Sequence, residues 1–228
     1  MPTPTLPLRL PCVAALALAC SSALAACPPP PRLWVERVIS ADCLACWQAS
    51  APRPRSGSVV LDWIVPTNDD AALTTAALTE AAERFPATQP DAQPAPREQP
   101  LPATGSGPRL SVSSGLAWNG YIGLGFELNR WRRPSVWPEG SQGWVALVER
   151  IPAGADGSGV ARQLVRAVAG PLVLPQPAQR DRLHHLVAVR LPASAQPERL
   201  AAVGWVQAPG GQVLLAAQSA QPGCKTAR

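Results

Sequence analysis

Two cysteines, Cys43 and Cys46, are the residues of this chain whose type and spacing are most suited to chemistry. They follow a strand-like apolar run at residues 33–39, after the turn Ser40-Ala41-Asp42. A thiol at a strand-to-helix turn has backbone N–H groups pointing at its sulfur, and these favour the thiolate that attacks disulfides and binds metals. The second cysteine lies about one helical turn further on, so the two sulfurs can close a small, reducible ring.

This spacing leaves three interpretations open. In a redox pair, Cys43 is the nucleophile and Cys46 the resolving thiol that expels the product. The neighbouring Asp42 opposes this chemistry, because a negative charge raises the pKa of a thiol. The alternatives are a non-catalytic disulfide and a metal-binding pair. The metal interpretation lacks nearby histidine or methionine ligands, so we expect neither a resident metal nor a cofactor.

The first 26 residues have the pattern of a signal peptide. Arg9 precedes the apolar run 13–19, and Ala23-Leu24-Ala25 is a small-residue cleavage site. The segment is too short and too interrupted to span a membrane, and no later stretch is long enough. We therefore expect export to the periplasm or the medium, with no transmembrane helix in the mature chain.

Cys27 has two interpretations. Leu24-Ala25-Ala26-Cys27 fits a lipobox, in which the cysteine carries a lipid anchor and the protein is an outer-membrane lipoprotein. Cleavage after Ala25 instead leaves four cysteines, an even set that suits an oxidising compartment. A Cys27–Cys224 disulfide would then join the two ends of the chain, and we favour it.

The apolar pattern predicts an α/β start and a β-rich continuation. Strands are expected at 33–39 and 58–65, with helices at 43–51 and 71–85. Residues 87–107 are rich in proline and have no hydrophobic period, which predicts a disordered insertion. After it, a period close to two predicts an antiparallel sheet or sandwich. Its strands are expected at 109–113, 117–128, 143–151, 161–174, 183–191, 200–208 and 212–217, with a hairpin turn at Pro209-Gly210-Gly211.

The cysteine turn resembles the N-terminal signature of a bacterial secreted thioredoxin-like family, named for its domain of unknown function 1223. The matching positions are Glu36, Ser40, Cys43, Cys46 and Ala49, with a weaker similarity at Arg162 and Leu164 and in the closing hairpin. Members also tend to carry a cysteine after the signal and another at the far end. The chain departs from the family at Asp42, at Trp47-Gln48, and at the reduced segment Asp62-Trp63.

This resemblance implies a thioredoxin-like module in 27–86, completed by strands from the β-rich part 108–228. It also implies two further site residues. Glu36 stands near the position of the buried acid that relays protons in thioredoxins, and Pro108 stands where their cis-proline faces the cysteines.

The predicted function is thiol–disulfide exchange in the cell envelope, with protein or small-molecule thiols and disulfides as partners. The alternative is a binding or scaffold protein in which the Cys43–Cys46 disulfide is structural. The net charge of +5 comes almost entirely from arginine, because Lys225 is the only lysine. One basic patch at 130–137 lies outside any recognisable module, so we expect no nucleic-acid partner.

Overall fold

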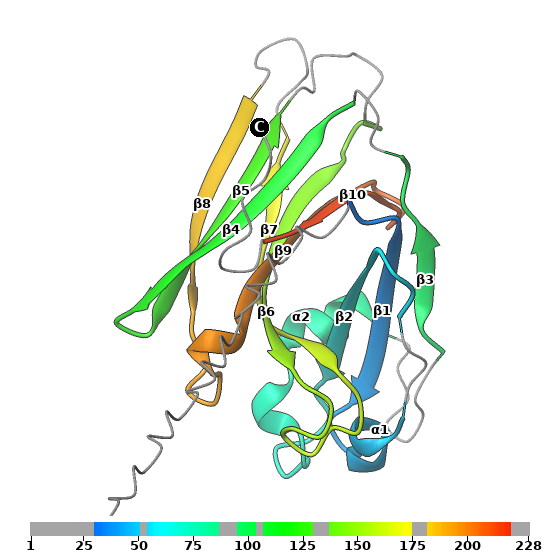
Figure 1. Ribbon diagram of the computed structural model, residues 1–228, viewed down its shortest axis with the longest axis vertical. Coiled ribbons are helices and arrows are strands. Elements are labelled where there is room, and N and C mark those ends of the chain that lie inside the picture. Colours follow the sequence, from blue (N-terminus) through cyan, green and yellow to red (C-terminus); the bar gives the residue numbers. More distant parts are fainter. Residues whose placement is uncertain are drawn as a thin grey trace, which may run out of the picture.

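The computed structural model describes residues 30–50, 54–86, 95–103, 107–129, 137–174 and 182–219. They form two β-sheets (Figure 1). The larger sheet has the strand order β10-β9-β6-β7-β2-β1-β3, and the smaller one has the order β4-β5-β8. The strands are β1 (Leu33–Ser40), β2 (Ser58–Val65), β3 (Arg97–Pro100), β4 (Arg109–Trp118), β5 (Tyr121–Asn129), β6 (Gln142–Ile151), β7 (Arg162–Val173), β8 (Arg182–Arg190), β9 (Leu200–Gln207) and β10 (Val213–Gln218).

The expected α/β thioredoxin-like fold is wrong: the chain is a β-rich sandwich. The two α-helices of the described ranges are only five and six residues long, α1 (Leu44–Gln48) and α2 (Thr79–Arg84). β1 and β2 pair in parallel as a β–α–β start predicts. On its other side β2 pairs in parallel with β7, and the antiparallel strands β6, β9 and β10 complete the same sheet. The two expected parts of the chain therefore share one sheet.

The helix expected at 71–85 is replaced by a 3₁₀ turn, Thr74–Ala76, and by α2. Backbone N–H groups in this segment donate to the ends of the parallel strands. Leu73 N donates to Ala41 O over 3.0 Å, and Leu78 N to Ile64 O over 3.1 Å. These bonds hold Leu78 extended, so a continuous helix cannot form.

β3 lies inside the segment 87–107 for which we expected disorder, and this corrects the expectation for residues 97–100. The strand pairs antiparallel with β1 at the edge of the sheet. Such pairing uses backbone groups and needs no hydrophobic period, which explains why the composition gave no sign of it.

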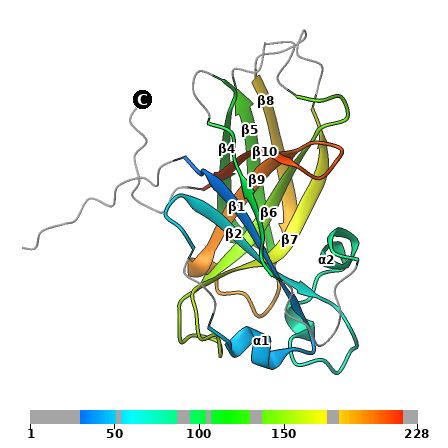
Figure 2. The ribbon, with the colours of Figure 1, turned by 90° about the vertical axis from the view of Figure 1, so that its right-hand side faces the viewer.

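The larger sheet curves until its two edge strands meet (Figures 1 and 2). The side-chain amide of Gln99 on β3 donates to Val213 O on β10 over 2.6 Å and accepts from Val213 N over 3.0 Å. These two side-chain hydrogen bonds replace the backbone hydrogen bonds that would otherwise join the edge strands β3 and β10. Strand alternation then sends Trp34, Trp63 and Trp205 into the concave side of the sheet.

Two further clusters complete the core. Between the sheets, Phe126 and Leu128 of β5 pack against Val145 and Leu147 of β6. A smaller cluster under α1 contains Ile39. None of the helices in the described ranges is long and apolar enough to cross a membrane.

Candidate functional site: the Cys43–Cys46 turn

The cysteine turn follows directly from the end of β1. Cys43 N donates to Ser40 O over 3.0 Å, and Cys43 then caps α1. Cys43 and Cys46 form a disulfide whose Cα atoms lie 5.2 Å apart, so the predicted bond between these cysteines is confirmed. Cys46 N points at Cys43 Sγ over 3.2 Å. A donor in this position favours negative charge on the first sulfur when the bond opens.

The two cysteines differ in exposure. Cys43 is half-buried, whereas Cys46 is only 9% exposed and packs on Ile39, Ile64 and Leu164. An incoming thiolate can therefore reach the first cysteine more easily than the second. This is the asymmetry expected of a nucleophile and its resolving partner.

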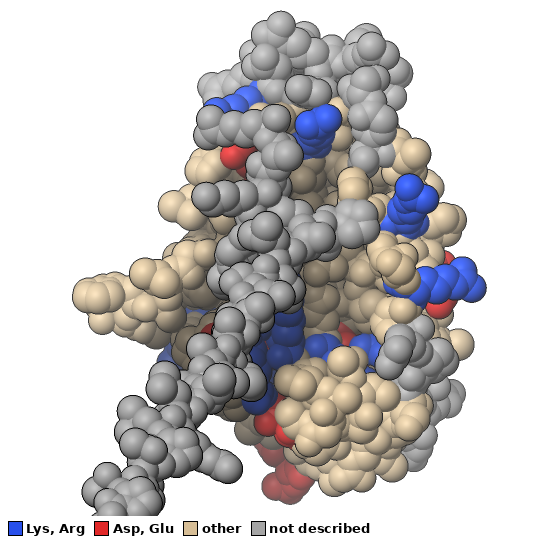
Figure 3. Space-filling view, viewed as in Figure 1, with Lys and Arg blue, Asp and Glu red and all other residues tan. Residues whose placement is uncertain are grey.

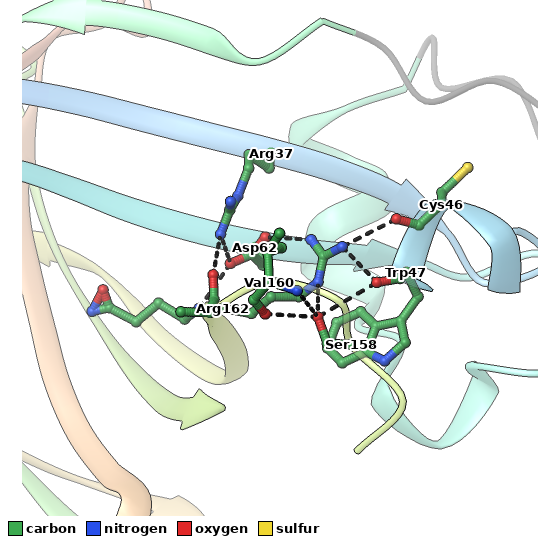
Figure 4. Close-up of polar contacts among 9 residues, drawn as sticks. Arg37, Cys46, Trp47, Asp62, Ser158, Val160 and Arg162 are labelled. Atoms are coloured by element: carbon green, nitrogen blue, oxygen red, sulfur yellow. Dashed lines mark hydrogen bonds and ion pairs between the residues drawn. The ribbon is translucent and has the colours of Figure 1, made fainter. Parts of the chain in front are cut away.

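Arg162 of β7 fixes the helix that carries the pair (Figure 4). Its Nη2 donates to Cys46 O over 3.1 Å and to Trp47 O over 2.7 Å. Its Nε donates to Ser158 Oγ over 2.8 Å. A five-residue helix leaves its last carbonyls without partners inside the helix, and the guanidinium supplies donors to two carbonyls of α1.

Asp62 of β2 holds that guanidinium in place. The carboxylate is fully buried and accepts from Arg162 Nη1 over 3.1 Å, from Arg37 Nη2 over 2.7 Å and from Gln163 N over 2.7 Å. Burial lowers the pKa of Arg162, and the charge of Asp62 partly restores it. Two arginines face one carboxylate, so the buried group carries a net positive charge close to the cysteine helix.

Trp47 ties α1 to the loop that precedes β7. Its Nε1 donates to Asp156 O over 2.8 Å, and the Arg162 guanidinium lies 4.7 Å from its ring centroid. Gly159 in this loop lies so close to the end of α1 that an added Cβ would collide with Gln48 O. The loop and the arginine together keep the short helix in one position.

The other predicted site residues do not gather around the cysteines. Glu36 shares the concave side of β1 with Trp34, whereas Ile39, which packs with Cys46, points to the other face. Pro108 precedes β4 in the smaller sheet, and the one cis peptide bond among the described residues is Gly170–Pro171. The predicted signal peptide, Cys27 and Cys224 lie outside the described residues.

Two further observations bear on the alternatives that the sequence left open for the cysteine pair. The carboxylate of Asp42, next to Cys43 in the sequence, accepts a hydrogen bond from Asn68 Nδ2 over 2.9 Å. Within the described ranges, no three histidine, cysteine, aspartate or glutamate side chains cluster in a way that could hold a metal ion.

A pocket of about 610 Å³ opens on the concave side of the larger sheet. Four tryptophans line it: Trp34, Trp63, Trp144 and Trp205. Four glutamates and two arginines also line it: Glu36, Glu80, Glu83, Glu98, Arg84 and Arg97. Arg84 is bound within the wall, where its Nε donates to Glu36 over 2.6 Å and its Nη1 to Gln207 over 2.8 Å.

Neither the buried charge pairs nor this pocket was predicted from the sequence. Asp62 interrupts a continuous apolar run, and a carboxylate at such a position needs a buried cation as its partner. That signal was present, but it did not identify Arg37 and Arg162 as the partners. The four tryptophans come from β1, β2, β6 and β9, so their convergence depends on the curvature of the sheet.

No family model matches the chain. No curated protein matches it either. Among solved structures, the chain is similar to HBP35 of Porphyromonas gingivalis, with a TM-score of 0.48 and 9% sequence identity, over 87% of this chain and 79% of that chain. Membership of the domain of unknown function 1223 family thus stays a prediction.

Proposed function

We propose that the protein exchanges thiols and disulfides in the cell envelope through Cys43 and Cys46. The observation that carries the proposal is the pair's asymmetry: a half-buried first sulfur that accepts Cys46 N–H, and a buried second sulfur. The positive group around Arg162 adds to it, because a nearby cation favours the thiolate form. The envelope location rests on the signal-peptide pattern of residues 1–26.

Starting from the disulfide, a substrate thiolate attacks Cys43 Sγ. The bond between the two cysteines breaks, and Cys46 leaves as a thiolate that takes up a proton. A second substrate thiolate then attacks the substrate sulfur of the mixed disulfide and releases Cys43. The two substrate thiols lose two electrons and become a disulfide, while the pair gains two electrons and becomes two thiols. The same steps in reverse reduce a substrate disulfide.

Trapping of the mixed disulfide tests this order of attack. Cys46→Ala should accumulate mixed disulfides on Cys43 in exported protein, because no thiol remains to resolve them. Cys43→Ala should accumulate few, since its remaining sulfur is buried. Asp42→Asn serves as a companion variant: it should speed alkylation of reduced Cys43 at mildly acidic pH, since removing a neighbouring negative charge lowers the thiol pKa. Equal and slow alkylation of both cysteines, with no trapped partner, would favour a structural disulfide.

The second candidate function is binding, and the tryptophan-lined pocket favours it. Arg84 is paired with Glu36, so the remaining charged residues of the lining are the three other glutamates and Arg97. The lining therefore carries a net negative charge, although the whole chain carries a net charge of +5. Negative charge beside tryptophan rings suits an organic cation such as an alkyl amine or a guanidinium compound. In this alternative the disulfide only braces α1.

Thermal-shift titration with putrescine, and with an uncharged diol of the same length, tests the binding function. The amine should raise the unfolding temperature in a saturable way, whereas the diol should not. Glu83→Gln should weaken the effect of the amine, and Glu198→Gln, exposed and outside the pocket lining, should not. Equal responses to both compounds would reject a cation site.

A further inference from the structure

The β4–β5 hairpin projects from the smaller sheet and ends in an uncharged tip (Figure 1). Residues 113–125 contain no charged side chain, and every residue from 115 to 121 is exposed. In the space-filling view this hairpin is the tan projection on the left, without blue or red atoms (Figure 3). A projecting tip of this kind is distinct from both sites described above.

Large apolar side chains gather on one face of the tip. Leu116 is 94% exposed, Trp118 77% and Tyr121 54%. Trp118 stands directly opposite Tyr121 across the hairpin, so these two side chains share a face. Leu116 lies next to them, in the irregular step of β4 between Ser114 and Ala117. Leu186 of β8, paired with Gly125 of β5, extends the same face and is 72% exposed. These four are among six large apolar side chains that are exposed in the described part of the chain.

We propose that this tip docks the protein on the surface of an anionic phospholipid bilayer, with Leu116, Trp118 and Tyr121 buried at the interface. Tryptophan and tyrosine favour that region, because their rings are apolar at one end and can donate a hydrogen bond at the other. The tip is convex, and a fluid bilayer accepts a convex tip without a matching pocket.

The polar groups of the hairpin are compatible with this environment. Residues Ala117 and Trp118 pair with Ile122 and Tyr121, so part of the backbone near the turn is bonded within the hairpin. The outward backbone groups of β4, an edge strand, stay among water and lipid headgroups in a shallow docking. Gly120 O accepts from Leu191 N over 2.8 Å. With no charged group between 113 and 125, shallow insertion desolvates no ion.

Charge behind the tip selects an anionic surface. Arg190 of β8 pairs with Tyr121 and is exposed, which places a cation beside the apolar tip at the level of the phosphates. The chain as a whole carries a net charge of +5. The charged pair of this sheet, Arg182 and Glu127, lies at its other end, where β5 and β8 meet near Asn129. Within this sheet, Arg190 thus lies at the tip, and Arg182 and Glu127 lie at the base.

Vesicle flotation of the exported protein tests the proposal. The wild type should float with vesicles of phosphatidylcholine and phosphatidylglycerol. The variant Leu116→Ser/Trp118→Ser/Tyr121→Ser should bind at least about tenfold more weakly, since three apolar side chains no longer leave water. Arg190→Gln should weaken binding about fivefold, and only to vesicles that contain phosphatidylglycerol. Val173→Ser, on β7 of the other sheet and also 77% exposed, is the matched control and should bind like the wild type.

Brominated phospholipids provide a second measurement. The fluorescence of Trp118 is obtained by subtracting the emission of Trp118→Phe from that of the wild type. Bromine placed near the headgroups should quench this fluorescence. Equal flotation of the wild type and the triple variant, or no quenching of Trp118, would overturn the proposal. Hairpin-dependent dimerisation without vesicle binding would also overturn it and assign the face to a second copy of the chain. None of these outcomes depends on whether Cys43 and Cys46 exchange disulfides.

Discussion

Arg162 donates a hydrogen bond of 3.1 Å to the carbonyl oxygen of Cys46, although 116 positions separate the two residues along the chain. The contact joins β7 to the helix of the cysteine turn. It places a buried cation next to the backbone of the second cysteine. The same guanidinium donates to the carboxylate of Asp62, which fixes its position. The geometry of the disulfide thus depends on a residue far from it in sequence.

Arg162→Gln should lower the free energy of unfolding by about 3–5 kcal/mol, because it removes one of the two arginine partners of a fully buried carboxylate and the charged donor to Cys46 O and Trp47 O. It should also free the end of α1 and slow alkylation of reduced Cys43, since the thiolate loses a nearby cation. Urea unfolding and a timed alkylation assay measure the two effects. Arg182→Gln removes an exposed pair with Glu127 and should cost no more than about 1 kcal/mol. Equal costs for both variants would contradict the role given to Arg162.

Trp47→Phe should cost about 1–3 kcal/mol. The change keeps the aromatic ring under Arg162 but leaves Asp156 O without the indole donor. Thermal unfolding measures the loss. The companion change Trp118→Phe alters an exposed ring and should have an effect within about 0.5 kcal/mol. A Trp47 variant as stable as this control would show that the loop does not hold α1 through that bond.

Gln99→Ala should cost about 1–2 kcal/mol, because one amide supplies both hydrogen bonds that close the curved sheet. The amide proton of Val213 should then exchange with solvent faster than in the wild type. Glu98→Ala, an exposed change on the same strand, should leave that exchange rate unaltered. Unchanged exchange at Val213 in the Gln99 variant would mean that the edges are held together by other contacts.

Gly120→Ala should cost about 1 kcal/mol more than Gly210→Ala. An added Cβ meets nothing within 4 Å at either position, but Gly120 has φ +76° and Gly210 does not have a positive φ. The difference therefore isolates backbone conformation. Chemical unfolding of the two variants measures it, and equal stabilities would argue against the left-handed turn at Asn119-Gly120.

Strand positions could be predicted well from the sequence, and their assembly could not. The expected strand at 58–65 coincides with β2, and the expected hairpin turn at Pro209-Gly210-Gly211 joins β9 to β10. Apolar periodicity is local, so it locates strands without naming their partners. The expected strand 117–128 is in fact interrupted by a turn at Asn119-Gly120, where both residues have positive φ. The Asn-Gly pair was a readable signal for that turn.

Of the candidate site, only the Cys43–Cys46 disulfide could be predicted from the sequence. The spacing of Cys43 and Cys46 was enough to predict a bond between them. The pairing of Asp62 with Arg162 follows from the parallel contact between β2 and β7 across 100 positions, and no local pattern encodes such a contact. The thioredoxin-like expectation failed for the same reason, because a β–α–β start does not determine which strands join its sheet.

The reduction potential of the Cys43–Cys46 pair tests the central claim most directly. The purified protein is equilibrated with glutathione buffers of graded potential, and the fraction of free thiol is measured by alkylation and mass. A pair built for exchange should titrate between about −120 and −270 mV, the range of known exchange proteins. A pair that stays oxidised to below about −300 mV would be a structural disulfide, and the proposed exchange function would then be wrong.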